Sequence, residues 1–312
     1  MKEILIAAPR GFCAGVDRAI SIVEKALEVY GKPLYVHHEI VHNRHVVDSL
    51  RAQGVIFVDS LDEIPENQTV IFSAHGVAPA VVENARAKNL RILDATCPLV
   101  TKVHIEARRY AREGYRIVLI GHKDHIEARG TYGEAPEQIT IVETLEDINN
   151  LEFPAEAKIA YLTQTTLSVR DTRGLIARLR ERFPGIEGPG SSDICYATTN
   201  RQEAVSAIAP QADVVFVIGS RNSSNSNRLK ELAESEGSRA YLIDSAADIQ
   251  AAQLGDRVSR VGLTAGASAP EVLVREVTER LRNEFGFEHM REVRIKEEDV
   301  TFKLPKELLA AK

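Results

Sequence analysis

Short apolar runs alternate with stretches of helical periodicity along most of the chain. Examples of the apolar runs are "QTVIF" before the turn "SAHG", "YRIVLI" before "GHKDH" and "ADVVFVI" before "GSRNSSN". The turns lead into segments such as "VAPAVVENARAKN" and "RLKELAESEG", whose apolar residues recur at helical spacing. Alternating strands and helices predict an α/β fold with small, mainly parallel sheets that are joined by crossover helices.

Three further helices are predicted, each directly after one of the three cysteines, Cys13, Cys97 and Cys195. The segments that follow them are "AGVDRAISIVEKALEVYG", "PLVTKVHIEARRYAREG" and "YATTNRQEAVSAIA". Gly31 and Gly114 suit the ends of the first two helices, and Pro98 suits the first position of the second. The roughly even spacing of the cysteines predicts three similar α/β lobes, at residues 1–96, 97–194 and 195–286, followed by a charged tail at 287–312.

Composition narrows the class of protein. The 312 residues are 44% hydrophobic and 27% charged with a net charge of -6, which is typical of a soluble globular protein and argues against nucleic acid or a membrane surface as a partner. No apolar run approaches the roughly 18 residues that a membrane-spanning helix needs. The start "MKEILIA" predicts a strand without a leader sequence, so we expect a cytoplasmic protein.

Cysteine usage is the first sign of chemistry. Three cysteines with no CxxC pair argue against a disulfide framework and against a zinc ribbon. They could be three unrelated buried thiols. They could also bind one metal centre, either zinc with a fourth ligand, commonly histidine, or an iron–sulfur cluster with one iron left open for substrate.

Polar residues gather where the predicted strands end, which is where ligands bind in such sheets. These candidates are His42, His75, His125, Thr165, Ser223, Ser224, Asn225 and Ser268. Seven of the eight residues in "SRNSSNSN" are small polar donors at a predicted helix start, a pattern that favours a phosphate or another anion. The alternative for "SAPE" (268–271) and for "SVRD" (168–171) is a helix cap with no further role.

A possible proton donor lies in "GHKDHIEARG". His125 and Glu127 stand two positions apart in a segment that we expect to be extended, so both side chains would point to the same side. A carboxyl group beside an imidazole is a plausible proton source, and the alternative is a solvated loop acid. His37, His38 and His45 are interpreted as packing or surface residues.

Long stretches of the chain resemble the 4-hydroxy-3-methylbut-2-enyl diphosphate reductases, the last enzymes of the non-mevalonate isoprenoid route. The matching stretches are "PRGFCAGVDRAI", "EIVHNRHVVDSL", "FSAHGV", "DATCPLVTKVH", "TQTTLSV", "DICYATTNRQEAV", "SRNSSNSNRL" and "TAGASAP". Near "GHKDHIE" the chain departs from the family, which usually has proline where Ile126 stands. The tail after about residue 285 matches least.

The resemblance implies a pseudo-threefold trefoil of three α/β lobes around a central cavity. It implies a [4Fe-4S] cluster, which can degrade to [3Fe-4S], on Cys13, Cys97 and Cys195, with the substrate hydroxyl on the open iron. The diphosphate would be held by His42, His75, Ser223, Ser224, Asn225 and Ser268. His125 and Thr165, with Thr166 as the adjacent alternative, would lie near the hydroxyl, and Glu127 would be the proton donor.

The implied reaction is the reductive dehydroxylation of the allylic diphosphate to isopentenyl and dimethylallyl diphosphate. Its electrons would come from an external one-electron donor such as ferredoxin or flavodoxin, because "GFCAGV" lacks the G-x-G-x-x-G spacing of a dinucleotide site. Two other readings of the residues stay open. One is a zinc-dependent hydrolase that uses cysteine with His75 or His125, and the other is a cluster-bearing redox sensor without turnover.

Overall fold

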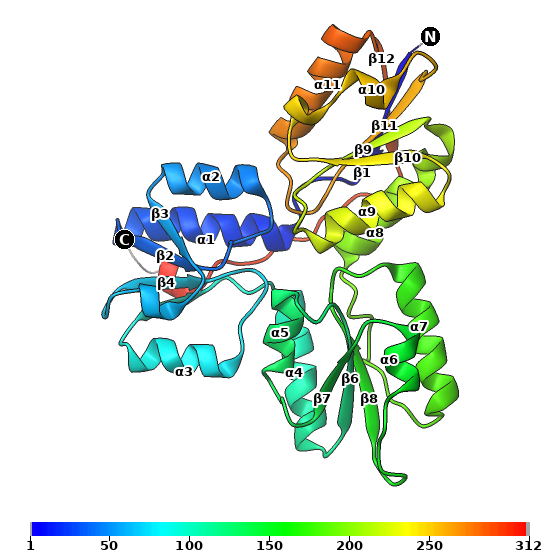
Figure 1. Ribbon diagram of the computed structural model, residues 1–312. Coiled ribbons are helices and arrows are strands. Elements are labelled where there is room, and N and C mark those ends of the chain that lie inside the picture. The colour runs from blue at the N-terminus through cyan, green and yellow to red at the C-terminus, as the bar shows by residue number, and fades with distance from the viewer. Residues whose placement is uncertain (1, 310–312) are drawn as a thin grey trace. The chain divides into compact units, whose positions relative to one another are not determined.

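The computed structural model describes residues 2–309, which form an α/β fold (Figure 1). The strands are β1 (Glu3–Ala8), β2 (Leu34–His37), β3 (Val55–Val58), β4 (Thr69–Phe72), β5 (Arg91–Asp94), β6 (Arg116–Ile120), β7 (Ile139–Val142), β8 (Ile159–Thr163), β9 (Val214–Ile218), β10 (Arg239–Ile243), β11 (Arg260–Ala265) and β12 (His289–Arg294). The helices are α1 (Ala14–Tyr30), α2 (Arg44–Ala52), α3 (Pro79–Ala87), α4 (Pro98–Arg112), α5 (Ile126–Tyr132), α6 (Leu145–Asn149), α7 (Val169–Arg182), α8 (Tyr196–Ile208), α9 (Ser224–Ser235), α10 (Ala251–Leu254), α11 (Glu271–Phe285) and α12 (Lys306–Leu309).

The strands form three sheets, in the orders β10-β9-β11-β1-β12, β3-β2-β4-β5 and β7-β6-β8. Every pair of neighbouring strands in these sheets is parallel. The predicted α/β class with three small parallel sheets is therefore confirmed. Of the described helices, none combines the length and the apolar character that a bilayer crossing requires.

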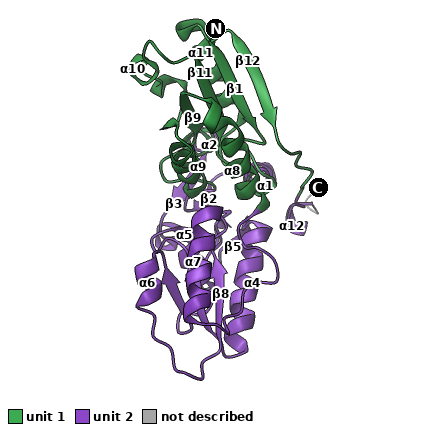
Figure 2. Cartoon of the chain, turned by 90° about the vertical axis from the view of Figure 1, so that its right-hand side faces the viewer, with its two compact units in different colours: residues 1–16, 41–50, 196–301 green, residues 17–40, 51–195, 302–312 purple. Residues whose placement is uncertain are grey.

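The chain divides into two compact units (Figure 2). Unit 1 comprises residues 1–16, 41–50 and 196–301, and it contains the five-stranded sheet. Unit 2 comprises residues 17–40, 51–195 and 302–312, and it contains the two smaller sheets. The trefoil arrangement of three lobes stays a prediction.

In unit 1, helices cover both faces of the five-stranded sheet. Side chains alternate along a strand, so Leu5 of β1 packs with Ala204 of α8, whereas its neighbour Ile4 joins the core under α11. The strand β1 lies between β11 and β12. The strand β12 lies in the predicted tail, so β1 and a strand of the tail share one sheet with β9, β10 and β11. The division into lobes at residues 96, 194 and 286 stays a prediction.

In unit 2, the strands β2, β4 and β8 are buried along their whole length, and β6 is buried except for Arg116 at its start. Their residues are mostly apolar, as expected of parallel strands that are covered on both faces. In β6, Ile117 and Leu119 pack with the α4 side, while Val118 and Ile120 face the α7 side. Strand ends in this unit carry the loops that hold His75, His125 and Thr165.

The predicted helix ends are confirmed. The helix α1 ends at Tyr30, and Gly31 follows with a φ of 70°, a conformation that glycine adopts without strain. The helix α4 starts at Pro98 and ends at Arg112, two residues before Gly114, whose φ is 80°.

Candidate active site

Each cysteine occupies the same local position in the fold, directly before a helix. Cys13 precedes α1, Cys97 is the N-cap residue of α4, and Cys195 precedes α8. Their backbone N–H groups donate to carbonyls in loops that follow strands, namely those of Ala267 (3.2 Å), Ala74 (2.9 Å) and Thr165 (3.0 Å). All three cysteines are described and half-buried, and none forms a disulfide.

The cysteines are divided between the units, because Cys13 belongs to unit 1 and the other two belong to unit 2. Within residues 2–309, no three His, Cys, Asp or Glu side chains form a metal-binding group. Burial raises the pKa of the Cys13 thiol, and the nearby positive charge of Arg201 opposes that shift. A metal that binds Cys13 must therefore displace its proton.

The part of the candidate anion site in unit 1 is built around His42. The Ser268 hydroxyl donates to the His42 carbonyl at 2.8 Å, and the side-chain amide of Asn222 lies 3.2 Å from His42 Nδ1. The loop continues into α2, where the N–H of Arg44 donates to Ser220 Oγ at 2.9 Å. The loop before α2 and the loop after β11 thus present His42 and Ser268 together.

The capping alternative for Ser268 is wrong. The helix α11 begins at Glu271 with Pro270 as its N-cap residue and no side-chain cap, because the Ser268 hydroxyl is engaged with His42. The same alternative for Ser168 is confirmed, since its Oγ accepts the N–H of Asp171 at 3.2 Å at the start of α7.

The start of α9 carries the serine and asparagine run. Ser223 is the N-cap residue, and its Oγ accepts from Ser226 N at 3.3 Å and from the Ser226 hydroxyl at 3.0 Å. Asn225 Oδ1 accepts the N–H of Ala267 at 2.9 Å. Asn225 Nδ2 is buried without a hydrogen-bond partner, and the residue is only 4% exposed. An unused buried donor at a helix N-terminus is suited to an anionic ligand.

Two glycines allow α9 to approach the strand ends. A Cβ atom on Gly219 or on Gly266 would lie 2.1 Å from Ser226 Oγ. The Ser226 side chain therefore fills the gap between the ends of β9 and β11, which brings the N-terminus of α9 against the loop of Ser268.

In unit 2, two of the predicted histidines face each other. The rings of His75 and His125 are 6.0 Å apart at an angle of 79°. His75 Nδ1 lies 3.1 Å from Ser73 Oγ, which orients its ring. The loop of His75 also supplies the Ala74 carbonyl that holds the Cys97 N–H.

Glu127 is buried and is paired with Thr165. The Thr165 N–H donates to Glu127 Oε1 at 2.6 Å, and the Thr165 hydroxyl donates to Oε2 at 3.0 Å. Both residues are 4% exposed. The carbonyl of Thr165 in turn accepts the N–H of Cys195. Thr165 thus contacts both the Glu127 carboxylate and the backbone of Cys195. Because Glu127 is buried, the alternative of a solvated loop acid is wrong.

The segment of His125 and Glu127 is not extended as predicted. His125 is the N-cap residue of α5 with extended backbone angles, and Glu127 lies in the first helical turn. The helix forms because His125 Nδ1 accepts the Glu127 N–H at 3.2 Å, which satisfies a free donor of the first turn. Thr166, the alternative to Thr165, accepts from the Gln164 amide at 3.0 Å instead.

An ion pair between a half-buried lysine and a buried aspartate braces the segment before Cys195. The Lys102 ammonium lies 3.0 Å from Asp193 Oδ1, and Asp193 Oδ2 accepts the N–H of Thr163 at 3.0 Å. Burial raises the pKa of Asp193 to about 6, although the Lys102 ammonium favours its ionised form. Because Lys102 is in α4, one pair ties the helix that follows Cys97 to the loop that leads into Cys195.

Comparisons with known proteins agree over nearly the whole chain. The family model described as LytB protein matches residues 4–282. A 4-hydroxy-3-methylbut-2-enyl diphosphate reductase of Aromatoleum aromaticum is 59% identical over 307 residues, 98% of each chain. The enzyme of that name from Salmonella typhi is 57% identical over 309 residues, which cover 98% of this chain and 97% of that protein.

A solved structure shows the same fold. The E-1-hydroxy-2-methyl-but-2-enyl-4-diphosphate reductase of Plasmodium falciparum has a TM-score of 0.96 and 40% sequence identity, over 99% of this chain and 97% of that one. The chain belongs to the LytB protein family. The resemblance inferred from the sequence and the expected enzyme class, an oxidoreductase, are confirmed. LytB-family proteins are iron–sulfur enzymes of isoprenoid biosynthesis.

Several residues that support this LytB-family site were missed by sequence reasoning. They are Lys102, Asp193, Arg201, Asn222, Ser226 and Glu298. Asn222 and Ser226 lie inside the run "SRNSSNSN", so a closer reading of that run would have included them. The hydrophobic pattern does not distinguish the buried Arg201 or the half-buried Lys102 from a solvated charge on a helix surface.

Proposed function

We propose that this LytB-family chain reduces 4-hydroxy-3-methylbut-2-enyl diphosphate to isopentenyl and dimethylallyl diphosphate, the last step of the non-mevalonate route. The observation that carries the proposal is the buried Glu127 carboxylate, which accepts two hydrogen bonds from Thr165 beside Cys195. It supports a proton donor that is kept away from bulk water and fixed next to a metal ligand.

Cys13, Cys97 and Cys195 would hold a [4Fe-4S] cluster. The donor set fits this group, because the chain has three thiols and no fourth cysteine, which leaves one iron without a protein ligand. When bound, such a cluster supplies single electrons and an open iron at which the substrate hydroxyl can bind.

The diphosphate would be held by His42, Ser223, Ser224, Asn225 and Ser268 of unit 1 and by His75 of unit 2. The unused Asn225 amide and the N-terminus of α9 support an anion in unit 1. Binding energy from this unreactive end would position the hydroxyl near His125 and Thr165.

Glu127 would give its proton to the departing hydroxyl. The allylic C–O bond breaks, the hydroxyl leaves as water, two electrons arrive singly from an external donor, and a second proton adds to carbon at either end of the allyl group. The N–H and hydroxyl of Thr165 stabilise the carboxylate that remains on Glu127. The electron donor would be a one-electron carrier such as a ferredoxin or a flavodoxin.

Metal analysis is the first test of the cluster. Protein purified without oxygen should contain iron and acid-labile sulfide, and Cys13→Ser should lose most of both. Zinc without sulfide would instead support the hydrolase reading and would contradict the proposal. A cluster without turnover of the allylic diphosphate would favour the redox sensor.

The proton donor is tested by Glu127→Gln. This variant should keep iron and substrate binding and should lose about 10²- to 10⁴-fold in turnover, the usual contribution of general acid catalysis. Glu137→Gln is the matched control, because Glu137 is exposed in the same unit. Equal turnover in the two variants would show that Glu127 is not the proton source.

A further inference from the structure

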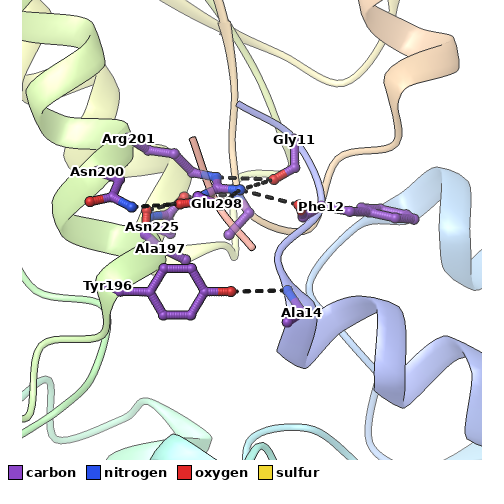
Figure 3. Close-up of polar contacts among 10 residues, drawn as sticks. Gly11, Phe12, Ala14, Tyr196, Ala197, Asn200, Arg201, Asn225 and Glu298 are labelled. Atoms are coloured by element: carbon purple, nitrogen blue, oxygen red, sulfur yellow. Dashed lines mark hydrogen bonds and ion pairs between the residues drawn. The ribbon is translucent and has the colours of Figure 1, made fainter. Parts of the chain in front are cut away.

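A fully buried arginine holds the backbone that leads into Cys13. Arg201 of α8 is 0% exposed, and its guanidinium donates to the Gly11 carbonyl from Nε (3.0 Å) and Nη2 (2.7 Å) (Figure 3). Nη2 also lies 3.2 Å from the Phe12 carbonyl. These carbonyls belong to the two residues before Cys13, so the guanidinium orders the turn that presents the thiol.

The countercharge of Arg201 comes from the segment after β12. The Glu298 carboxylate lies 3.1 Å from Arg201 Nη1, and its side chain is only 14% exposed. The amide of Asn200 also donates to Glu298 Oε1 at 2.8 Å (Figure 3). A buried guanidinium without a partner is strongly destabilised, so Arg201 depends on Glu298 to stay in place.

The remaining contacts of the Cys13 turn leave it little freedom. Gly11 has a φ of 65°, and its N–H donates to the Ala265 carbonyl at 3.0 Å. The N–H of Ala14 donates to the Tyr196 hydroxyl at 3.2 Å. Arg201 adds side-chain donors to the carbonyls of both Gly11 and Phe12.

A second arginine makes similar contacts in unit 2, and all the residues involved belong to that unit. Arg18 of α1 donates from Nη1 to the Thr96 carbonyl at 3.0 Å and from Nε to the Lys303 carbonyl at 2.9 Å. Thr96 directly precedes Cys97. Leu308, further along the same terminal segment, is fully buried. In each unit, one arginine joins the terminal segment to the backbone just before a cysteine.

We propose that residues 295–309, named here the C-terminal strap, position two of the cluster ligands. Glu298 acts on Cys13 through Arg201, and the Lys303 carbonyl acts on Cys97 through Arg18. The inference rests on the proposed function, in which these cysteines hold the cluster. The strap keeps both turns ordered before iron arrives, so that less ordering is needed when the cluster binds.

Hydrogen exchange on the metal-free, full-length protein tests the positioning directly. Glu298→Ala should speed amide exchange at least tenfold at residues 11–14 and leave residues 95–98 close to wild type. Arg18→Ala should show the opposite pattern. Glu297→Ala is the matched control for the strap, because Glu297 is exposed, and it should change neither region.

Iron release from the loaded protein gives the second readout. Loss of iron to a chelator, followed by the decay of the cluster absorption, should be about ten- to a hundredfold faster in both variants, the range typical of residues behind metal ligands. Glu298→Gln, which retains an oxygen acceptor for Arg201, should give an intermediate rate. Melting temperatures identify any variant that unfolds globally, and Glu298→Gln then provides the decisive comparison.

The inference would be overturned if both Glu298 variants and Arg18→Ala showed the same amide exchange and the same iron release as the control Glu297→Ala. Faster exchange spread evenly over the whole chain would also overturn it, because a merely structural role predicts no preference for the cysteine turns. Wild-type protein that binds no iron would refute the proposed function instead, while the exchange patterns would still decide whether the strap orders the turns.

Discussion

Replacing Thr165 by valine tests the proposed proton-donor site by removing one hydrogen bond. Valine has the same shape as threonine, so Thr165→Val removes the hydroxyl that donates to Glu127 Oε2 at 3.0 Å and keeps the backbone donor to Oε1 at 2.6 Å. The backbone carbonyl that holds the Cys195 N–H also stays. Because Glu127 and Thr165 are both 4% exposed, water cannot readily replace the lost donor.

The size of the effect follows from the charge on the acceptor. A hydrogen bond to a charged group contributes about 1.5–3 kcal/mol, and each 1.36 kcal/mol changes a rate tenfold, so kcat should fall by about ten- to 150-fold. KM should change little, because the diphosphate contacts are untouched. The assay is anaerobic turnover of the allylic diphosphate with a one-electron donor, on protein of matched iron content.

Thr163→Val is the control for this prediction. Thr163 is 3% exposed, and its hydroxyl donates to the Gln164 carbonyl at 3.2 Å, not to Glu127. Thr163→Val should lose about 1 kcal/mol of stability, the usual contribution of one buried hydrogen bond between neutral groups. Equal kcat values for the two variants would refute the assignment of Thr165 to the proton-donor site.

Three other predictions concern binding, packing and pH. Asn225→Asp keeps the acceptor for the Ala267 N–H but puts a negative charge where the unused amide now lies, so KM should rise at least tenfold with iron content unchanged; an unchanged KM would exclude this amide from the anion site. Gly219→Ala should lower the free energy of unfolding by about 1–3 kcal/mol in urea titrations, because the new Cβ meets Ser226 Oγ, and Ser226→Gly in the same chain should restore most of it. Burial lowers the pKa of His37 to about 4, below its value near 6.5 in the unfolded chain. The neutral imidazole therefore contributes fully to the free energy of unfolding above pH 6.5, and this contribution is lost as the pH falls toward 4. Between pH 7.5 and pH 5, the free energy of unfolding should fall by about 2 kcal/mol more in wild type than in His37→Gln. Equal decreases for the two proteins in urea titrations would contradict the lowered pKa of His37.

The alternation of apolar runs and helical stretches was enough to predict the fold class and the helices that follow the cysteines. Gly31 and Gly114 marked helix ends correctly, because only the local backbone decides such a stop. Sheet membership was harder, since period and composition do not encode which strands pair. Nothing in "EILIAA" indicates that this first strand pairs with residues 260–263 and 289–294.

Side-chain roles at the site were predictable only in part. The sequence pointed to Glu127 and Thr165, which the structure brings into contact, but it gave the wrong backbone for Glu127 because the capping role of His125 was not foreseen. Ser268 fitted a cap motif equally well, and its hydroxyl instead bonds a carbonyl 226 residues away in sequence. Such long-range choices depend on tertiary packing, which local motifs do not record.

The position of β1 between β11 and β12 also bears on how the protein is made. On the ribosome, both neighbours of this strand are synthesised more than 250 residues after residues 3–8. At about 5–20 residues per second, the first strand waits on the order of 10–60 seconds without a partner. The contacts of the Cys13 turn with Ala265 and with Arg201 are therefore completed only after residues 51–195 of unit 2 have emerged.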